Sequence, residues 1–298
     1  MQTQSGSKSM QLGLNTLIRN VDGQDEWVDL EVMIDLAIEL GLDLIDIQLD
    51  RGIRSLDDGY LKTVRDRCSD CGIDIGYAGV GQGFVGTAEQ GHLRVGAPLS
   101  PDDMALRISE VERGIDAAVA LGTPLVRLFA GAIPESSPDR SRIHEEMIQA
   151  FQRVATYGAN RGVRVGLHNH PPAVAPTGRD ILGLIEDIDH ENITVIMDTG
   201  QWHGSIGTNR LGIADLHVNE YAFMEQVMPH TTYVRAKIYR IDTGVEEWLD
   251  YDRIFSIFRS ADYEGPVSIV FEDRGNTCDY REALSKAIAY LRPFVEAN

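Results

Sequence analysis

The sequence predicts a single α/β domain in which eight strand–helix units close into a parallel barrel. Strand-like and amphipathic helical runs alternate along the chain, and no break in composition separates two domains. Strand starts recur every 29 to 40 residues, apart from an interval of 52 between Ile73 and Leu125. A doubly wound open sheet is the alternative, but its strands would be covered on both faces and almost continuously apolar. These strands carry ionic residues on one face, which favours the barrel.

The predicted elements follow from hydrophobic periodicity, with a period of two residues for strands and 3.6 for helices. The strands are Leu12–Thr16, Leu44–Leu49, Ile73–Val80, Leu125–Ala130, Val163–His168, Ile193–Asp198, Tyr233–Tyr239 and Val267–Glu272. The helices are Asp29–Leu40, Tyr60–Cys71, Ser100–Leu121, Arg142–Asn160, Gly178–Ile188, Tyr251–Ser260 and Tyr280–Val295. Several helices are followed by a glycine such as Gly41 or Gly122, where a helix ends readily. We assign residues 11–298 to one (β/α)₈ TIM barrel. Residues 1–10, which are polar, are assigned to a disordered N-terminal arm.

Composition excludes some partners. The chain has 298 residues, of which 43% are hydrophobic, and a net charge of −19. An acidic surface disfavours nucleic acid and anionic membranes, because affinity for polyanions comes chiefly from Lys and Arg. No apolar run reaches the length of a membrane span, and residues 1–10 lack the apolar core of a signal peptide. Cys68, Cys71 and Cys278 are interpreted as free thiols of a reducing compartment, so we expect a cytoplasmic protein. Homo-oligomer formation is compatible with the sequence.

The connection Gly79–Pro98 is long and rich in glycine. It lacks both the GK[ST] sequence of a phosphate-binding loop and a GxGxxG that opens a helix, so we expect no nucleotide cofactor. A mobile lid over the barrel mouth is the interpretation that we favour.

Polar and ionic residues occupy the strand positions that alternate with the apolar ones. In Val163–His168, for example, Val163, Val165 and Leu167 share the face that helices should cover. The opposite, inward set is Asn15, Asp46, Gln48, Arg127, His168, His170, Asp198, Arg235, Lys237 and Glu272. Barrel enzymes build their sites at the C-terminal ends of strands, and such a group is costly to bury without a role. The spacing places His168, Asp198, Arg235 and Glu272 on successive strands, so they could surround a divalent ion or a vicinal diol.

Four segments resemble the xylose isomerase-like barrel superfamily, whose members are often labelled sugar phosphate isomerase/epimerase. They are Val165–His170, Val195–Gly200, Val234–Lys237 and Gly265–Glu272. Leu121–Gly122 and Val126–Gly131 are also similar to that family's fourth strand. The resemblance implies a sugar-related enzyme such as a ketose 3-epimerase, hydroxypyruvate isomerase, inosose dehydratase or C-glycoside-cleaving lyase.

The resemblance also implies a divalent metal, Mn²⁺, Mg²⁺ or Zn²⁺, held by Glu, Asp, His and Glu from strands five to eight. Asp198 and Glu272 match two of these positions. His168 stands where Glu is usual, and Arg235 stands where the metal-binding His is usual. Because Arg stays protonated, Arg235 cannot be a ligand. The metal site expected here is therefore His168, Asp198 and Glu272, with Arg235 beside it.

The predicted reaction is proton abstraction next to a carbonyl of a sugar or polyol, leading to isomerisation, epimerisation or β-elimination. Glu272 or His170 is the expected base, and Lys237, Arg235 or a metal would polarise the carbonyl oxygen. The expected substrate-binding residues are Arg127, Asn169, Gln201, Trp202, His203 and Arg235. An abasic-site endonuclease, which resemblance to another branch would imply, is disfavoured by few His/Glu ligands and by the acidic charge. The non-enzymatic alternative is a degenerate barrel that binds carbohydrate or acts as a subunit.

Overall fold

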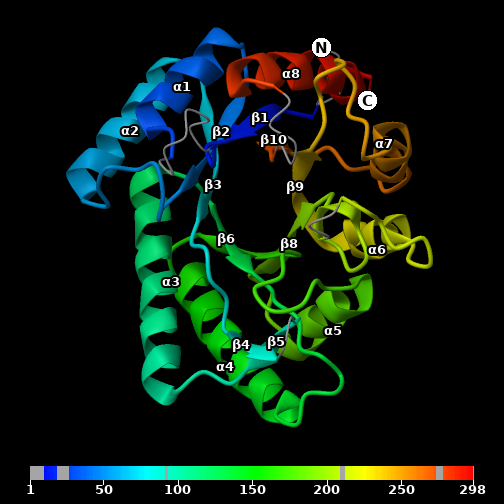
Figure 1. Cartoon of the computed structure of the whole chain (residues 1–298). Helices are drawn as coiled ribbons and strands as arrows, with labels where there is room; N and C mark the ends of the chain where they lie inside the picture. Colours follow the sequence, from blue (N-terminus) through cyan, green and yellow to red (C-terminus); the bar gives the residue numbers. More distant parts are fainter. Residues whose placement is uncertain (1–9, 19–26, 91–92, 209–211, 273–277, 298) are drawn as a thin grey trace, which may run out of the picture.

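The computed structural model describes residues 10–18, 27–90, 93–208, 212–272 and 278–297, and in it eight parallel strands form a closed barrel (Figure 1). The strands are β1 (Leu12–Asn15), β2 (Leu44–Gln48), β3 (Asp74–Gly79), β6 (Leu125–Phe129), β7 (Arg164–His168), β8 (Ile193–Asp198), β9 (Thr231–Ile238) and β10 (Val267–Phe271). They follow one another around the barrel in chain order, and β1 closes it by pairing with both β2 and β10. The predicted (β/α)₈ barrel is confirmed.

Helices surround the barrel on its outside (Figure 1). They are α1 (Leu30–Glu39), α2 (Asp58–Asp70), α3 (Pro101–Leu121), α4 (Arg140–Ala159), α5 (Gly178–Ile188), α6 (Glu220–Val227), α7 (Tyr251–Ser260) and α8 (Tyr280–Glu296). Local chemistry explains several of their ends. Thr177 and Asp180 form a reciprocal capping box at the start of α5. Ser100 caps the start of α3, and Gly122 ends that helix with a φ of 76°. Within the described ranges, no helix is long and apolar enough to cross a membrane.

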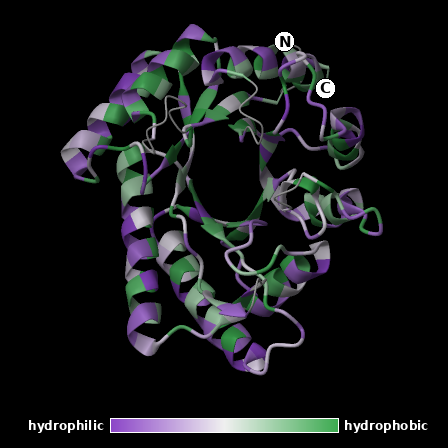
Figure 2. Cartoon of the chain, in the orientation of Figure 1, coloured by the Kyte–Doolittle hydropathy of each residue, from purple (hydrophilic) through white to green (hydrophobic). Residues whose placement is uncertain are grey.

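The main core lies between the strands and the helices. Val163, Val165, Leu167 and Ile269 are buried there, as predicted, and Phe271 packs against the same core while half-buried. In Figure 2 hydrophilic and hydrophobic segments alternate along the helices, as expected of helices that bury one face. Met10, assigned from sequence to the N-terminal arm, is also buried in this core; residues 1–9 lie outside the described ranges.

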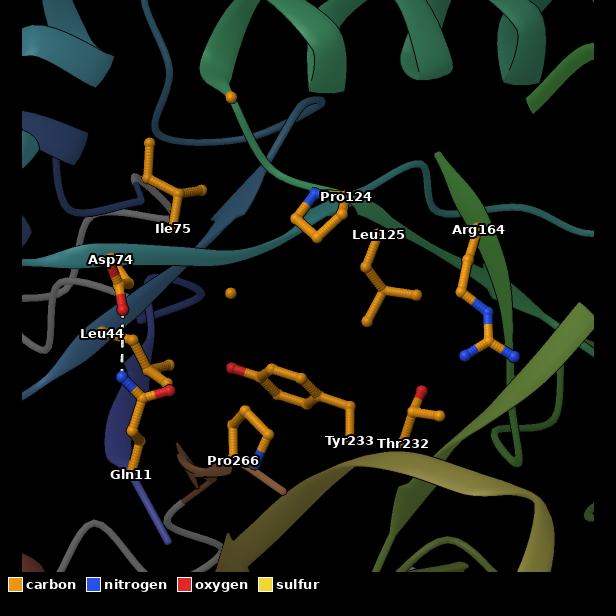
Figure 3. A pocket seen from close by; sticks show the side chains of 12 residues that line it. Gln11, Leu44, Asp74, Ile75, Pro124, Leu125, Arg164, Thr232, Tyr233 and Pro266 are labelled. Carbon is orange, nitrogen blue, oxygen red and sulfur yellow. Dashed lines mark hydrogen bonds between the residues drawn. The ribbon is translucent and has the colours of Figure 1, made fainter. Parts of the chain in front are cut away.

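A second, smaller apolar cluster fills the lower part of the barrel interior. It consists of Leu44, Tyr77, Leu125, Ile196 and Tyr233, and Leu44 and Leu125 are the first residues of β2 and β6. Below this inner apolar layer, a cavity of about 410 Å³ opens at the N-terminal end of the barrel (Figure 3). Its rim includes Gln11 and Asp74, whose side chains are joined by a 2.9 Å hydrogen bond.

The Gly-rich connection after β3 contains an element that the sequence did not predict. Strands β4 (Gly86–Gln90) and β5 (Leu93–Ala97) form an antiparallel hairpin, in which Gly86 pairs with Ala97. The hairpin lies beside α4 in Figure 1, and Gly96 approaches Ile133 in the loop that precedes that helix. The connection is thus partly a two-stranded sheet packed at the rim.

Candidate active site

Charged side chains gather at the C-terminal half of the barrel interior. Arg127, His168, Asp198, Arg235 and Lys237 are all buried and come from β6, β7, β8 and β9. Glu272 directly follows β10 and is 38% exposed at its side chain, so it reaches the mouth. Because side chains alternate across a strand, the residues that flank them point into the main core and fix their inward direction. The sequence-predicted inward set is therefore brought together.

Asp198 is the hub of this charged set. Its Oδ2 lies 3.3 Å from Arg235 Nε, 3.3 Å from Lys237 Nζ and 3.4 Å from His168 Nε2. Its Oδ1 accepts a 2.9 Å hydrogen bond from the backbone N–H of Gly200. The side chain is 0% exposed, so these partners replace the water that the carboxylate would otherwise bind.

Lys237 links this buried hub to the mouth. Its ammonium Nζ lies 2.9 Å from Glu272 Oε2 as well as 3.3 Å from Asp198 Oδ2, and the side chain is 3% exposed. A buried cation thus stands between a fully buried carboxylate and one that is open to solvent. Charge-assisted contacts of this length are strong and directional.

The side chain of Arg127 determines the tautomer of His168. Arg127 donates from Nη2 to Gln48 Oε1 at 2.7 Å and contacts His168 Nδ1 from Nη1 at 3.2 Å. Because a guanidinium has no acceptor, His168 Nδ1 must accept, and its proton sits on Nε2, facing Asp198. Burial, together with the charges of Arg127 and Lys237, holds the pKa of His168 well below its usual range. His168 is therefore a neutral ring that donates to Asp198.

His170 also lies in this region, stacked on Phe129 with ring centroids 4.8 Å apart. Its Nδ1 donates to the carbonyl of Pro171 at 3.1 Å, which leaves the lone pair on Nε2. Burial, with smaller effects from His168 and Lys237, lowers the pKa of His170 to about 3. The ring is neutral at physiological pH and is a weak base.

The other predicted sugar-binding residues have different surroundings. Asn169 is fully buried and bonded at both ends of its amide to the backbone of Asp198. Gln201 is buried and donates to Tyr239 Oη at 3.3 Å. Trp202 is 0% exposed in the main core, 5.9 Å from the ring of Phe223, whereas the neighbouring His203 is exposed. The structure therefore brings Arg127 and Arg235 into the charged set, but not Trp202.

A second buried carboxylate, Asp46 on β2, lies closer to the N-terminal end of the barrel than Asp198. It accepts hydrogen bonds from Tyr233 and Ser268. Burial raises its pKa to about 6, although these bonds and the charge of Arg235 act in the opposite direction. Arg235 donates to Tyr77, and burial lowers the pKa of Arg235 to about 10, so it stays positive at neutral pH.

Tyr77, Tyr233 and Ser268 are site neighbours that the sequence analysis did not single out. Tyr233 and Ser268 share the inward alternation of Arg235 and Glu272, so the same pattern could have found them. Tyr77 was harder to place, because the pairing of β2 with β3 shifts register between Ile45 and Ile47.

The residues present do not fit the metal site that the resemblance implies. The space between Asp198 and Glu272 is taken by the ammonium of Lys237. His168 directs a proton, rather than a lone pair, toward Asp198. Within the part of the chain that the structure describes, no group of three or more His, Cys, Asp or Glu side chains is arranged to hold a metal. The predicted ligand set of His168, Asp198 and Glu272 is thus replaced by an ion-pair network.

Comparison with known proteins places this geometry in context. The model of the family described as xylose isomerase-like TIM barrel matches residues 34–294. A putative hydroxypyruvate isomerase from Mus musculus is 23% identical over 206 residues, which span 65% of this chain and 69% of that protein. A D-psicose 3-epimerase crystallised in the presence of D-fructose has a TM-score of 0.71 at 16% identity, covering 96% of this chain and 100% of that one. A probable 3-DHS dehydratase from Bacillus anthracis has a TM-score of 0.63 at 16% identity, covering 94% and 98%.

Proposed function

Because the chain belongs to the xylose isomerase-like TIM barrel family, we propose that it is a sugar isomerase or epimerase. The proposed reaction begins with removal of the proton on the carbon next to a sugar carbonyl. Relatives described as a 3-epimerase and as a putative hydroxypyruvate isomerase support this reaction class.

One observation carries the proposal, namely the contact between Lys237 and Glu272 at the mouth of the barrel. Glu272 is open to solvent while Lys237 is buried beneath it, with 2.9 Å between Nζ and Oε2. A sugar entering from the mouth meets a carboxylate base and an ammonium on the same side. These are the two groups that abstraction of a proton next to a carbonyl requires.

The proposed roles follow from this placement. Glu272 takes the proton from the carbon next to the carbonyl, and the electron pair moves to the carbonyl oxygen, forming an ene-diolate. Lys237 faces that oxygen and stabilises its negative charge. Return of a proton to the neighbouring carbon gives an isomer, and return to the opposite face gives an epimer. Asp198 holds Lys237 in position through the 3.3 Å contact between Oδ2 and Nζ.

The remaining predicted residues have supporting roles in this proposal. Arg127 and Arg235 balance the charges of the buried carboxylates, and Gln201 and His203 belong to the loop after β8, where sugar hydroxyls would bind. His170, as a neutral ring, is the reserve candidate for the base. The ring pair formed by His170 and Phe129 offers an apolar face for a sugar ring.

The test is exchange of substrate protons with solvent. The protein is incubated in D₂O with a panel of ketoses and with hydroxypyruvate, and deuterium incorporation is followed by NMR. Glu272→Gln keeps the shape and removes the base, so exchange should fall by about 10²–10⁴-fold, with a much smaller change in substrate affinity. Glu264→Gln, an exposed carboxylate that precedes β10, is the control and should leave exchange unchanged.

Three outcomes would redirect the proposal. Unchanged exchange in Glu272→Gln would move the base to His170. Loss of a hydroxyl from the substrate, detected as an unsaturated product, would indicate a lyase that uses the same first step. Absence of exchange with every substrate in the wild-type protein would favour the carbohydrate-binding, non-catalytic barrel.

A further inference from the structure

We infer that the ammonium of Lys237 takes the place of a divalent cation in this barrel, so that the site is built to work without a metal. The role of Lys237 in catalysis rests on the proposed function. Its role as the resident cation rests on the geometry of the charged set alone.

Lys237 occupies the space that a metal ion would need. Lys237 Nζ lies 3.3 Å from Asp198 Oδ2 and 2.9 Å from Glu272 Oε2, so it already bridges the two carboxylates. Carboxylate oxygens bind Zn²⁺ and Mg²⁺ at about 2.0–2.2 Å, so an ion shared by the two carboxylates would have to stand between them. That space is filled by a group that also carries positive charge.

Both ring nitrogens of His168 are already engaged. Arg127 Nη1 donates to Nδ1, so the lone pair of that nitrogen is used. The other nitrogen, Nε2, therefore carries the proton and faces Asp198 at 3.4 Å. A metal ligand must offer a lone pair. With Arg127 in this position, neither nitrogen of His168 has a lone pair available for a metal ion.

The charges of the six ionisable side chains in this set balance one another. Asp46, Asp198 and Glu272 supply three negative charges when ionised, and Arg127, Arg235 and Lys237 supply three positive ones. All of these except Glu272 are buried. These six side chains sum to zero without any ion, and a divalent cation would add two positive charges to them in a region of low dielectric, which is unfavourable.

Metal binding tests this directly and does not depend on activity. Purified wild-type protein is dialysed against chelator and titrated with Mn²⁺, with bound ion followed by electron paramagnetic resonance. We expect no stoichiometric binding by the wild type. Lys237→Ala exposes two carboxylates without their shared cation, so Mn²⁺ binding should appear. Lys237→Arg keeps the positive charge and should bind none.

A fallback variant and two further measurements complete the experiment. If the Lys237→Ala chain does not fold, as judged by circular dichroism, Lys237→Met keeps the aliphatic length and replaces it. In Lys237→Ala with Asp198→Ala, the gained Mn²⁺ binding should disappear, because one of the two carboxylates is gone. In the wild type, proton exchange into the substrate should be the same before and after chelation.

The results separate this inference from the proposed function. One Mn²⁺ bound per wild-type chain and lost in Asp198→Ala would overturn it. Equal absence of Mn²⁺ in wild type and in a folded Lys237→Ala would also overturn it, because the ammonium would not then be what keeps the ion out. Mn²⁺ binding by Lys237→Ala but not by the wild type supports it. If the wild type shows no proton exchange with any substrate, the proposed function fails while this result stands.

Discussion

The side-chain amide of Asn169 is hydrogen-bonded to the backbone of Asp198 at both ends. Its Nδ2 donates to the carbonyl oxygen of Asp198 at 2.9 Å, and its Oδ1 accepts from the backbone N–H of Asp198 at 2.6 Å. Asn169, which follows β7, thus fixes the backbone of Asp198 at the end of β8. Because Asp198 contacts His168, Arg235 and Lys237, this link holds the whole charged set in register.

Asn169→Ala should destabilise the protein by about 2–4 kcal/mol, because it leaves two buried backbone groups of Asp198 without partners. The free energy of unfolding is measured by urea denaturation. Asn160→Ala, at the exposed end of α4, is the control and should change it by no more than about 0.5 kcal/mol. A loss in the free energy of unfolding as small as that of Asn160→Ala would show that the hydrogen bonds of Asn169 contribute little to stability.

The tautomer of His168 can be observed in solution. In the wild type, ¹⁵N NMR should show a neutral ring with its proton on Nε2 at neutral pH, because Arg127 donates to Nδ1. Arg127→Met removes a neighbouring positive charge and should raise the pKa of His168, although burial will still hold it down. An imidazolium signal in the wild type at pH 7 would contradict the assigned hydrogen bonds.

Asp46 should make stability depend on pH in a definite direction. Burial raises its pKa from 3.8 to about 6, so the folded state favours the protonated form. That stabilisation is complete below pH 3.8 and is lost as the pH rises through about 6. The free energy of unfolding of the wild type, relative to Asp46→Asn, should fall by about 3 kcal/mol at most between pH 4 and pH 7.

The measurement for Asp46 is urea denaturation of both proteins at several pH values in this range. Asp70→Asn, an exposed carboxylate at the end of α2, is the control. A constant difference between the wild type and Asp46→Asn across the range would show that Asp46 has the same pKa in the folded and unfolded chain.

Trp202 and His203 are neighbours in the sequence with opposite surroundings. Trp202 is fully buried, so Trp202→Ala should cost about 3–5 kcal/mol of stability. His203 is exposed, and His203→Ala should change stability by no more than about 0.5 kcal/mol. The KM for substrate tests whether either residue binds the sugar. It should rise in His203→Ala and stay constant in folded Trp202→Phe. A raised KM in Trp202→Phe would support the sugar-binding role expected from the sequence.

The outline of the fold was readable from the sequence because local and global signals agree. Ile193–Asp198, Gly178–Ile188 and Tyr251–Ser260 match the structure to the residue, and each has clear periodicity or a capping residue. Helix α6 was missed because its Glu220–Val227 segment has only eight residues and two buried side chains. The β4–β5 hairpin was missed because its five-residue arms mix glycine and polar residues without strict alternation.

The candidate site was predictable as a set of inward residues but not as a network. Alternation along the strands identified Asp198, Lys237 and Glu272, yet strand spacing cannot show that Lys237 stands between the two carboxylates. Nor can it show that Arg127 fixes the proton of His168, since that depends on side-chain conformations from two strands. Trp202 follows the same strand as Asp198, and only the path of the loop reveals that it turns into the core.

The inner apolar layer has a consequence for how reactants travel. Leu44, Tyr77, Leu125, Ile196 and Tyr233 are all buried, and three of them also border the cavity at the opposite end (Figure 3). They separate that cavity from Asp46 and the charged set above it. Among the described residues this layer closes the N-terminal end of the barrel, so a ligand reaches the charged set from the end where Glu272 lies. In the proposed reaction, a proton taken up by Glu272 would exchange with solvent at that same end, so the rate of isotope exchange would report on solvent access to Glu272.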